Sequence, residues 1–178
     1  MYSGAVHPSD ETYYGGTQDN GTIKSATVPT WITVFSGDGG VTAVDYRLPT
    51  MVYTEYVYLC IQRSTNAGAS WARTMGTPPN NIPTSGPSQS DGTSDRCAFI
   101  APYVMAPSNP DTMVAGTYKV YLTTNGGATW SSISNDLTGS GVSGVGSVGS
   151  VISAIAIAKS SASTFYVEIG RASCRERV

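Results

Sequence analysis

The chain is poor in charged residues and has no long apolar run, and both shortages exclude classes of protein. Charged residues make up 12 % of the 178 residues, and Lys and Arg cluster only in the last few positions, so nucleic acid is not an expected partner. No apolar run approaches the roughly 18 residues of a membrane-spanning helix. Residues 1–10 lack the basic and apolar regions of a signal peptide, so any secretion signal is expected outside this sequence.

Cysteine and histidine are also scarce. Cys60 and Cys97 lie in different segments and form no disulfide framework, and the chain has no spacing typical of a metal site. We therefore expect no metal and no cofactor. The single histidine, His7, precedes Pro8 and is predicted to be a surface turn residue rather than a ligand or base.

What is abundant is Gly, Ser, Thr and Tyr, in short strand-like stretches bounded by turn residues. Four segments repeat one pattern, in which an apolar strand end is followed by a polar turn and a second short strand. They are Val6–Thr17, Val44–Glu55, Met105–Thr117 and Ile157–Val167. After the second and third copies comes a further strand and then an eight-residue turn, so the pattern predicts a repeated four-stranded meander.

The eight-residue turn is nearly identical in its two copies, STNAGASW and TTNGGATW. An Asn side chain accepts hydrogen bonds from backbone N–H groups two residues on, Gly supplies positive φ, and Trp buries a large ring. Ser or Thr at the first position is placed to bond back across the turn. The residues with these roles are Ser64, Asn66, Gly68, Ser70 and Trp71 in the first copy and Thr123, Asn125, Gly127, Thr129 and Trp130 in the second.

Both copies resemble the Asp-box of BNR-repeat proteins, Ser-x-Asp-x-Gly-x-Thr-Trp. Here Asn replaces the Asp, which keeps the acceptor but removes the charge that a metal site would want. The resemblance implies a structural turn on the face away from any active site. The stretches YYGGTQDNGT and SGDGGVTAVD also look like secreted bacterial BNR propellers of the sortilin-like or xyloglucanase-like superfamily.

The repeats and the resemblance together imply an all-β fold, a partial β-propeller of four-stranded antiparallel blades. We expect about three and a half blades in an open arc, with residues 1–167 as the propeller domain. The expected blades are residues 1–35, 37–76, 96–136 and 150–167.

Residues 168–178, EIGRASCRERV, break the composition abruptly and contain three of the Arg residues. They match a frame translation of a common short-read sequencing adapter, so we expect a tail without biological role and a chain that is a piece of a longer protein. Without this tail the net charge is about −3.

In a propeller, the turns between second and third strands share one face with the connections between blades. QDNG (Gln18–Gly21) and SGDGG (Ser36–Gly40) are such segments, as are the long loops Gly76–Asp95 and Asn135–Gly149. Asp19 and Asp38 should therefore meet on this face. Two carboxylates suit glycoside hydrolysis, Ca²⁺ binding or simple turn chemistry, and these alternatives stay open.

Two functions from different classes are consistent with this pattern. The first is a glycan- or protein-binding module of a larger secreted or cell-surface protein, with no complete catalytic site in this stretch. The second is a glycoside hydrolase, xyloglucanase-like or sialidase-like, with part of its active site at Asp19 and Asp38. A propeller acting as a photosystem assembly factor is a third possibility. Tyr46, Tyr56, Tyr58, Tyr103 and Tyr118 are candidates for sugar stacking, although strand Tyr residues more often pack between blades.

Overall fold

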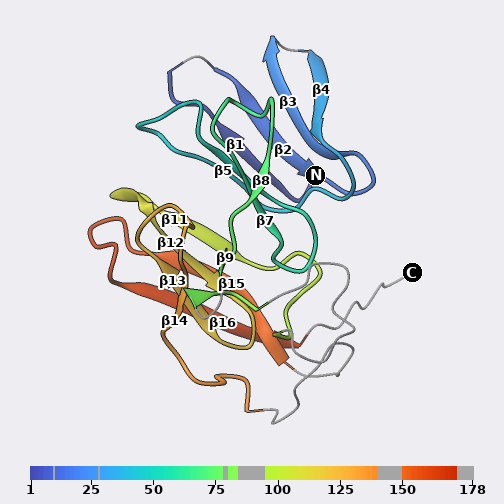
Figure 1. Cartoon of the computed structure of the whole chain (residues 1–178). Coiled ribbons are helices and arrows are strands. Elements are labelled where there is room, and N and C mark those ends of the chain that lie inside the picture. Colours follow the sequence, from blue (N-terminus) through green and yellow to red (C-terminus); the bar gives the residue numbers. More distant parts are fainter. Residues whose placement is uncertain (10, 28, 78–79, 84–94, 140–149, 172–178) are drawn as a thin grey trace.

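The computed structural model describes residues 1–9, 11–27, 29–77, 80–83, 95–139 and 150–171, and every regular element among them is a strand. Three antiparallel sheets have four strands each, in the order of the chain (Figure 1). The first contains β1 (Ser3–Val6), β2 (Tyr13–Thr17), β3 (Gly21–Thr27) and β4 (Thr30–Phe35). The second contains β5 (Thr42–Val44), β6 (Val52–Glu55), β7 (Ile61–Ser64) and β8 (Ala72–Arg73). The third contains β11 (Tyr103–Ala106), β12 (Asn109–Gly116), β13 (Val120–Thr123) and β14 (Ser131–Ser132).

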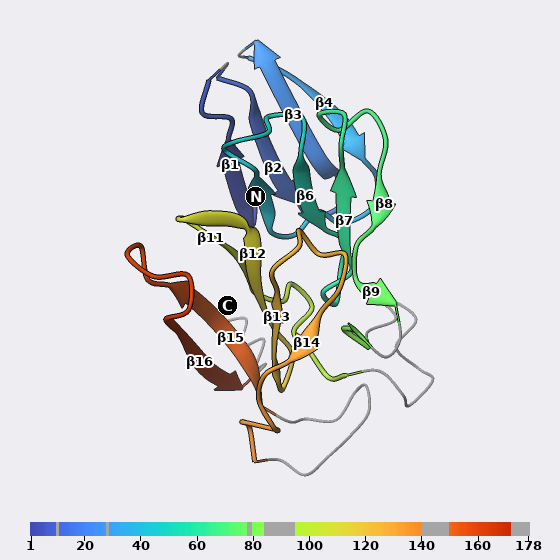
Figure 2. The same ribbon diagram turned by 60° about the vertical axis from the view of Figure 1, so that its left-hand side comes forward.

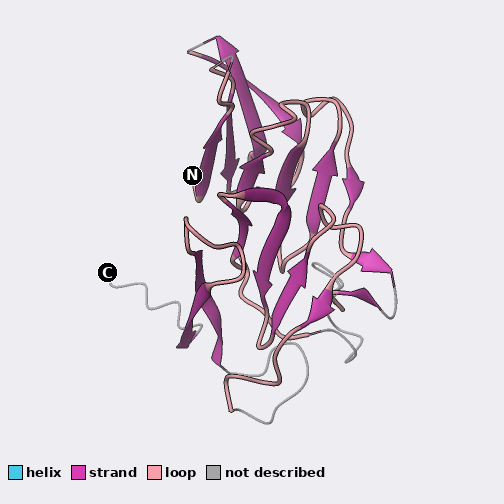
Figure 3. Cartoon of the chain, turned by 90° about the vertical axis from the view of Figure 1, so that its left-hand side faces the viewer, coloured by secondary structure: helices cyan, strands magenta, loops and turns pink. Residues whose placement is uncertain are grey.

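The remaining strands of the described residues form two two-stranded sheets. β15 (Ser150–Ile157) and β16 (Phe165–Arg171) form a two-stranded sheet, and β9 (Gly76–Thr77) pairs with β10 (Asn80–Asn81) after the second sheet. The sheets follow one another along an arc (Figure 2). The strands, drawn in magenta in Figure 3, are joined by loops and turns. The prediction of an all-β, partial propeller with an open arc of about three and a half blades is confirmed.

Apolar side chains between neighbouring sheets hold the arc together. Between the second and third sheets, Ile61 and Met75 pack with Tyr103, Met113 and Trp130 in one buried cluster. A second cluster joins the third sheet to the two-stranded one. The first strands of neighbouring sheets lie side by side, β1 against β5 and β11 against β15. Burial of these residues supplies most of the stabilisation, at about 25 cal/mol for each Å² of apolar surface removed from water.

Strand β16 runs past Val167, where we predicted the propeller to end. Glu168, Ile169, Gly170 and Arg171 continue the ladder with β15, and Arg171 pairs with Ser150. Residues 172–178 lie outside the described residues. The adapter origin of the tail stays a prediction about the underlying DNA.

Strand β6 ends at Glu55, because residues 56–60 leave the sheet as a turn. One local expectation from the sequence is wrong. His7 lies in the β1–β2 turn as expected, but its side chain is only 3 % exposed, and Ser9 N donates a 3.2 Å hydrogen bond to its Nδ1. In the part of the chain that the structure describes, no helix is long and apolar enough to cross a membrane.

Candidate functional site

The connections of these antiparallel sheets alternate between two ends of the arc. We call one end the loop face, where second strands turn into third strands and where one sheet connects to the next. We call the other end the box face, because it holds the two eight-residue turns. The described segments of the loop face are residues 18–20, 36–41, 56–60, 95–102, 117–119 and 133–139.

Asp19 and Asp38 meet on the loop face. The backbone N–H of Asp19 donates a 2.7 Å hydrogen bond to Oδ1 of Asp38. Asp19 is exposed and has a φ of 64°, a left-handed conformation that Asp tolerates better than most residues. Gly39 N donates to Thr17 O at 2.9 Å, which fixes the same two segments to each other a second time. The two carboxyl-bearing segments are therefore held together by one backbone–backbone hydrogen bond and by one that the Asp38 side chain accepts.

Glycine makes this close approach possible. A Cβ atom on Gly16 would overlap the backbone of Gly39 and Gly40, and one on Gly39 would overlap the carbonyl of Gly21. At Gly40 a Cβ would lie 2.5 Å from Oε2 of Glu55. The glycines of YYGGT and SGDGG thus let the loop that carries Asp38 lie directly on the β2–β3 turn.

The same loop covers a carboxyl group that sequence reasoning missed. Glu55, at the end of β6, is 0 % exposed. Its Oε1 accepts hydrogen bonds from Leu59 N at 3.0 Å and from Ala101 N at 2.8 Å, and Val41 N donates to Oε2 at 3.3 Å. Glu55 therefore joins the β4–β5 connection, the β6–β7 turn and the segment before β11. The indication that the sequence offers for this role is that Glu55 is the one charged residue in the run MVYTEYVYL.

Burial raises the pKa of Glu55 from its ordinary value of 4.5 to about 8, although the three backbone N–H groups act in the opposite direction. Since the pKa is higher in the folded state, folding takes up a proton between about pH 4.5 and 8. The stabilisation from this group is complete below pH 4.5 and is lost as pH rises to about 8.

We therefore expect the free energy of unfolding to fall by a few kcal/mol across this window, because each pKa unit corresponds to about 1.4 kcal/mol. Urea unfolding at pH 5, 6, 7 and 8 measures it, with Glu55→Gln as the reference that cannot titrate. Parallel curves for the two proteins would show that Glu55 has no raised pKa.

Further polar groups of the loop face connect the third sheet to its neighbours. Asp95 is 4 % exposed and accepts hydrogen bonds from the Tyr121 hydroxyl at 2.6 Å and the Thr117 hydroxyl at 3.1 Å. Arg96 donates to Ser150 O and its guanidinium lies over the Tyr118 ring. These contacts join the segment at residues 95–96 to the third sheet and to β15. Residues 78–79 and 84–94 of the first long loop and 140–149 of the second lie outside the described residues.

On the box face, the two eight-residue turns have the same hydrogen bonds. Oγ of Ser64 accepts from Asn66 N at 3.2 Å and from Gly68 N at 2.8 Å, and Oδ1 of Asn66 accepts from Ser70 N at 2.8 Å. Thr123, Asn125, Gly127 and Thr129 repeat this pattern. Gly68 and Gly127 have φ values of 90° and 83°. The Asn acceptor bonds four residues on rather than two, since the hydroxyl at the first position occupies the nearer N–H.

Each turn is also tied to the preceding sheet, which the sequence did not reveal. Nε1 of Trp71 donates to Val34 O at 2.8 Å, and Nε1 of Trp130 donates to Thr74 O at 2.9 Å. The fourth residue of each turn receives two further bonds from the preceding sheet. Its carbonyl accepts from Tyr14 and Lys24 in the first copy and from Tyr53 and Arg63 in the second. These repeated contacts between sheets give the turns a structural role.

The first sheet contains a shortened third copy, Ser25–Trp31, which sequence reasoning also missed. Ser25 pairs with Tyr13 in the position that Ser64 and Thr123 occupy in their sheets. The segment is one residue shorter and lacks the Asn and Gly. Oγ of Ser25 is buried with no hydrogen-bond partner among the described residues.

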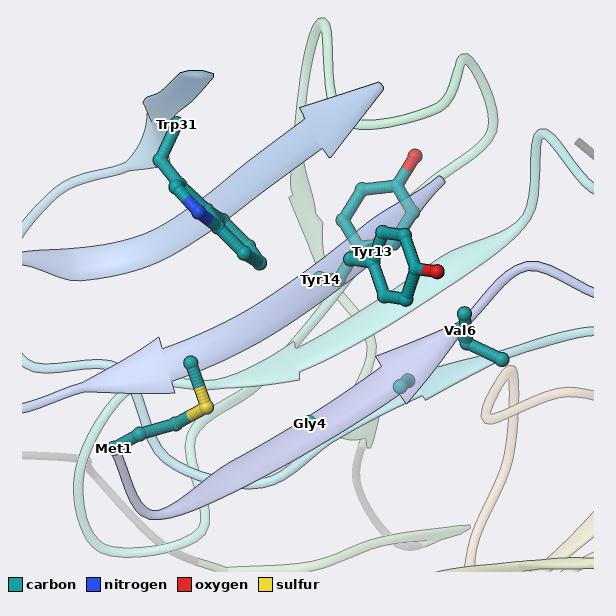
Figure 4. Close-up of a pocket in the computed structure, with 7 residues that line it drawn as sticks. Met1, Gly4, Val6, Tyr13, Tyr14 and Trp31 are labelled. Atoms are coloured by element: carbon teal, nitrogen blue, oxygen red, sulfur yellow. The ribbon is translucent and has the colours of Figure 1, made fainter. Parts of the chain in front are cut away.

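An apolar hollow of about 320 Å³ lies on the first sheet, beside this shortened copy. Met1, Val6, Tyr13 and Trp31 line it (Figure 4). Trp31 is 41 % exposed and its ring lies 6.5 Å from that of Tyr13. Its lining carries no carboxylate, and the Tyr and Trp positions are those that pack between sheets elsewhere in the arc.

In the described ranges no three His, Cys, Asp or Glu side chains gather as metal ligands would. Among the described segments of the loop face, the groups available to a ligand include the carboxylates of Asp19 and Asp38 and the aromatic rings of the neighbouring segments.

Comparison with known proteins shows the fold. No protein-family model matches the chain, and no curated protein matches it by sequence. Among solved structures, the GH74 enzyme of Niastella koreensis is similar with a TM-score of 0.60 and 19 % identity, over 96 % of this chain and 26 % of that enzyme. An ancestral GH74 enzyme is similar with a TM-score of 0.59 and 17 % identity, over 92 % of this chain and 21 % of its own. The chain thus spans about a quarter of these neighbours or less.

Proposed function

We propose that the chain is part of a glycan-binding β-propeller and that its loop face holds the ligand. The contact between Asp19 N and Asp38 Oδ1 carries this proposal, because it fixes two carboxyl-bearing segments side by side on one face. Carboxylates accept hydrogen bonds from the hydroxyl groups of a sugar, and charged acceptors make the stronger bonds. The fold shared with two GH74 enzymes supports a carbohydrate ligand over other classes.

Several finer assignments belong to this proposal. The eight-residue turns are Asp-boxes, and the chain is a BNR-type propeller of the sortilin-like or xyloglucanase-like kind. The full protein is larger, bacterial, and secreted or on the cell surface. Its further blades would cover the apolar hollow of the first sheet. The propeller domain is residues 1–167, with the adapter-derived tail following it.

A glycoside hydrolase is the second candidate function. The approach of Asp19 to Asp38 favours it, since glycoside hydrolysis uses a pair of carboxyl groups. One oxygen of Asp38 already accepts the Asp19 N–H. Hydrolysis would need one of the two carboxyl groups as the acid and the other as the base or nucleophile. This candidate predicts release of reducing ends from xyloglucan oligosaccharides, whereas the binding module predicts affinity without turnover.

The replacement Asp38→Asn tests the proposal. It keeps an oxygen that accepts the Asp19 N–H and removes only the charge, so the melting temperature should change little. We expect affinity for a xyloglucan heptasaccharide, measured by isothermal titration calorimetry, to fall about tenfold, the effect of losing about 1.4 kcal/mol. Asp111→Asn is the matched control, an exposed carboxylate near the box face that pairs with Arg47. Wild-type protein that binds neither this sugar nor cellohexaose would refute the proposed function.

A further inference from the structure

We propose that Tyr58 and Phe99 form a stacking subsite for a pyranose ring on the loop face, and that buried Glu55 holds this subsite in shape. The inference rests on the proposed function and extends it to the class of ligand, an oligosaccharide of pyranoses whose rings present apolar C–H faces.

The two rings come from different segments of the loop face. Tyr58 belongs to the β6–β7 turn and Phe99 to the segment before β11, and their centroids lie 5.3 Å apart at 86°. Phe99 is 39 % exposed and Tyr58 is half-buried. In an edge-to-face pair one ring covers only one face of the other, so aromatic surface remains open to solvent. Such surface is what a pyranose ring packs against.

The backbone of the turn that carries Tyr58 has an unfavourable conformation. Tyr58 and Leu59 both have left-handed conformations, with φ values of 54° and 57°, which non-glycine residues adopt rarely. Strain of this kind persists only where the surroundings enforce it, and it concentrates at functional sites. Val57 and Leu59 are 2 % and 0 % exposed, so the turn buries both neighbours while Tyr58 stays at the surface.

Glu55 supplies the contacts that enforce this conformation. A single oxygen, Oε1, accepts Leu59 N from the first segment and Ala101 N from the second. Tyr58 N also donates a 2.8 Å hydrogen bond to Phe99 O. The two ring-bearing segments are thus fixed to each other before any ligand arrives, and Glu55 acts as a positioning residue.

The subsite continues toward the two carboxylates. A Cβ on Gly37, the neighbour of Asp38, would lie 2.5 Å from the ring of Tyr56, which is two residues before Tyr58. The ring of Tyr56 therefore lies against the loop that carries Asp38, and Tyr56 belongs to the same β6–β7 turn as Tyr58.

Calorimetric titration of the full chain with cellohexaose tests the inference. We expect Tyr58→Ala and Phe99→Ala each to weaken binding about tenfold, whereas Tyr58→Phe, which keeps the ring, binds like wild type. The matched control is Tyr46→Ala, because Tyr46 is a Tyr on the box face with 42 % exposure. Thermal melting checks that the variants are folded. Phe99 is exposed and lies outside the strained turn at Tyr58 and Leu59, so Phe99→Ala tests the subsite without changing that turn.

The outcomes separate the two proposals. Weaker binding in Asp38→Asn together with wild-type binding in both Tyr58→Ala and Phe99→Ala would overturn the stacking subsite and leave the proposed function standing. No binding of cellohexaose or of the xyloglucan heptasaccharide by wild type would remove the proposed function and this inference with it. Equal losses in Tyr46→Ala and Phe99→Ala would also count against the subsite.

Discussion

Replacing Trp130 by alanine should lower the free energy of unfolding by about 3–5 kcal/mol, the range for truncating a buried Trp. The side chain is 1 % exposed and lies in the cluster that joins the second and third sheets. Its Nε1 donates to Thr74 O, so the replacement also leaves a buried carbonyl without that donor. Urea unfolding followed by circular dichroism measures the loss.

The other two Trp residues are the internal controls for this prediction. Trp71 makes the equivalent bond to Val34 O but is only partly buried, so Trp71→Ala should cost less. Trp31, in the shortened copy and 41 % exposed, should tolerate alanine within about 1 kcal/mol. Equal losses at Trp130 and Trp31 would contradict the idea that these turns stabilise the protein by tying neighbouring sheets.

Replacing Glu55 by alanine should cost at least about 3 kcal/mol, because two buried N–H groups and one partly buried N–H group lose their acceptor, and each orphaned buried group costs about 1–3 kcal/mol. Those groups belong to Val41, Leu59 and Ala101, on three separate segments. The loss should therefore appear as a loosened loop face and not only as a lower melting temperature. Amide hydrogen exchange at the three positions measures this directly.

Glu55→Gln is the matched variant for that experiment. It keeps one side-chain oxygen that accepts from Leu59 N and Ala101 N, so we expect it to retain most of the protection from exchange. A Glu55→Ala protein with unchanged protection at Leu59 and Ala101 would show that the carboxyl group does not hold the two segments. The stacking subsite would then lose its support.

The sequence was sufficient for the architecture because the repeats are local. Each hairpin and each eight-residue turn is specified by residues close together in the chain, such as Ser64 to Trp71, and recurrence at similar spacing indicates stacked sheets. The same alternation of turns placed Asp19 and Asp38 on one face without any knowledge of their distance. Pattern reasoning works here because strand direction alone decides which end of a sheet a turn occupies.

What the sequence did not reveal depends on contacts between distant segments. Glu55 looks like an ordinary strand-end residue until Val41, Leu59 and Ala101 are seen around it. The bond from Trp130 to Thr74 joins residues whose pairing no local pattern records. The shortened turn at Ser25–Trp31 escaped notice because it lacks the Asn and Gly by which the other copies were identified. In each case the missing information is the packing of one sheet against the next.

Mapping the bound sugar by nuclear magnetic resonance tests the central claim, that the loop face is the ligand-binding face. Titration of the ¹⁵N-labelled chain with the xyloglucan heptasaccharide should shift amide signals of residues 18–20, 36–40 and 56–60. The signals of the turns at residues 64–71 and 123–130, on the box face, should stay in place. Shifts confined to those turns, or to the apolar hollow around Trp31, would contradict the account.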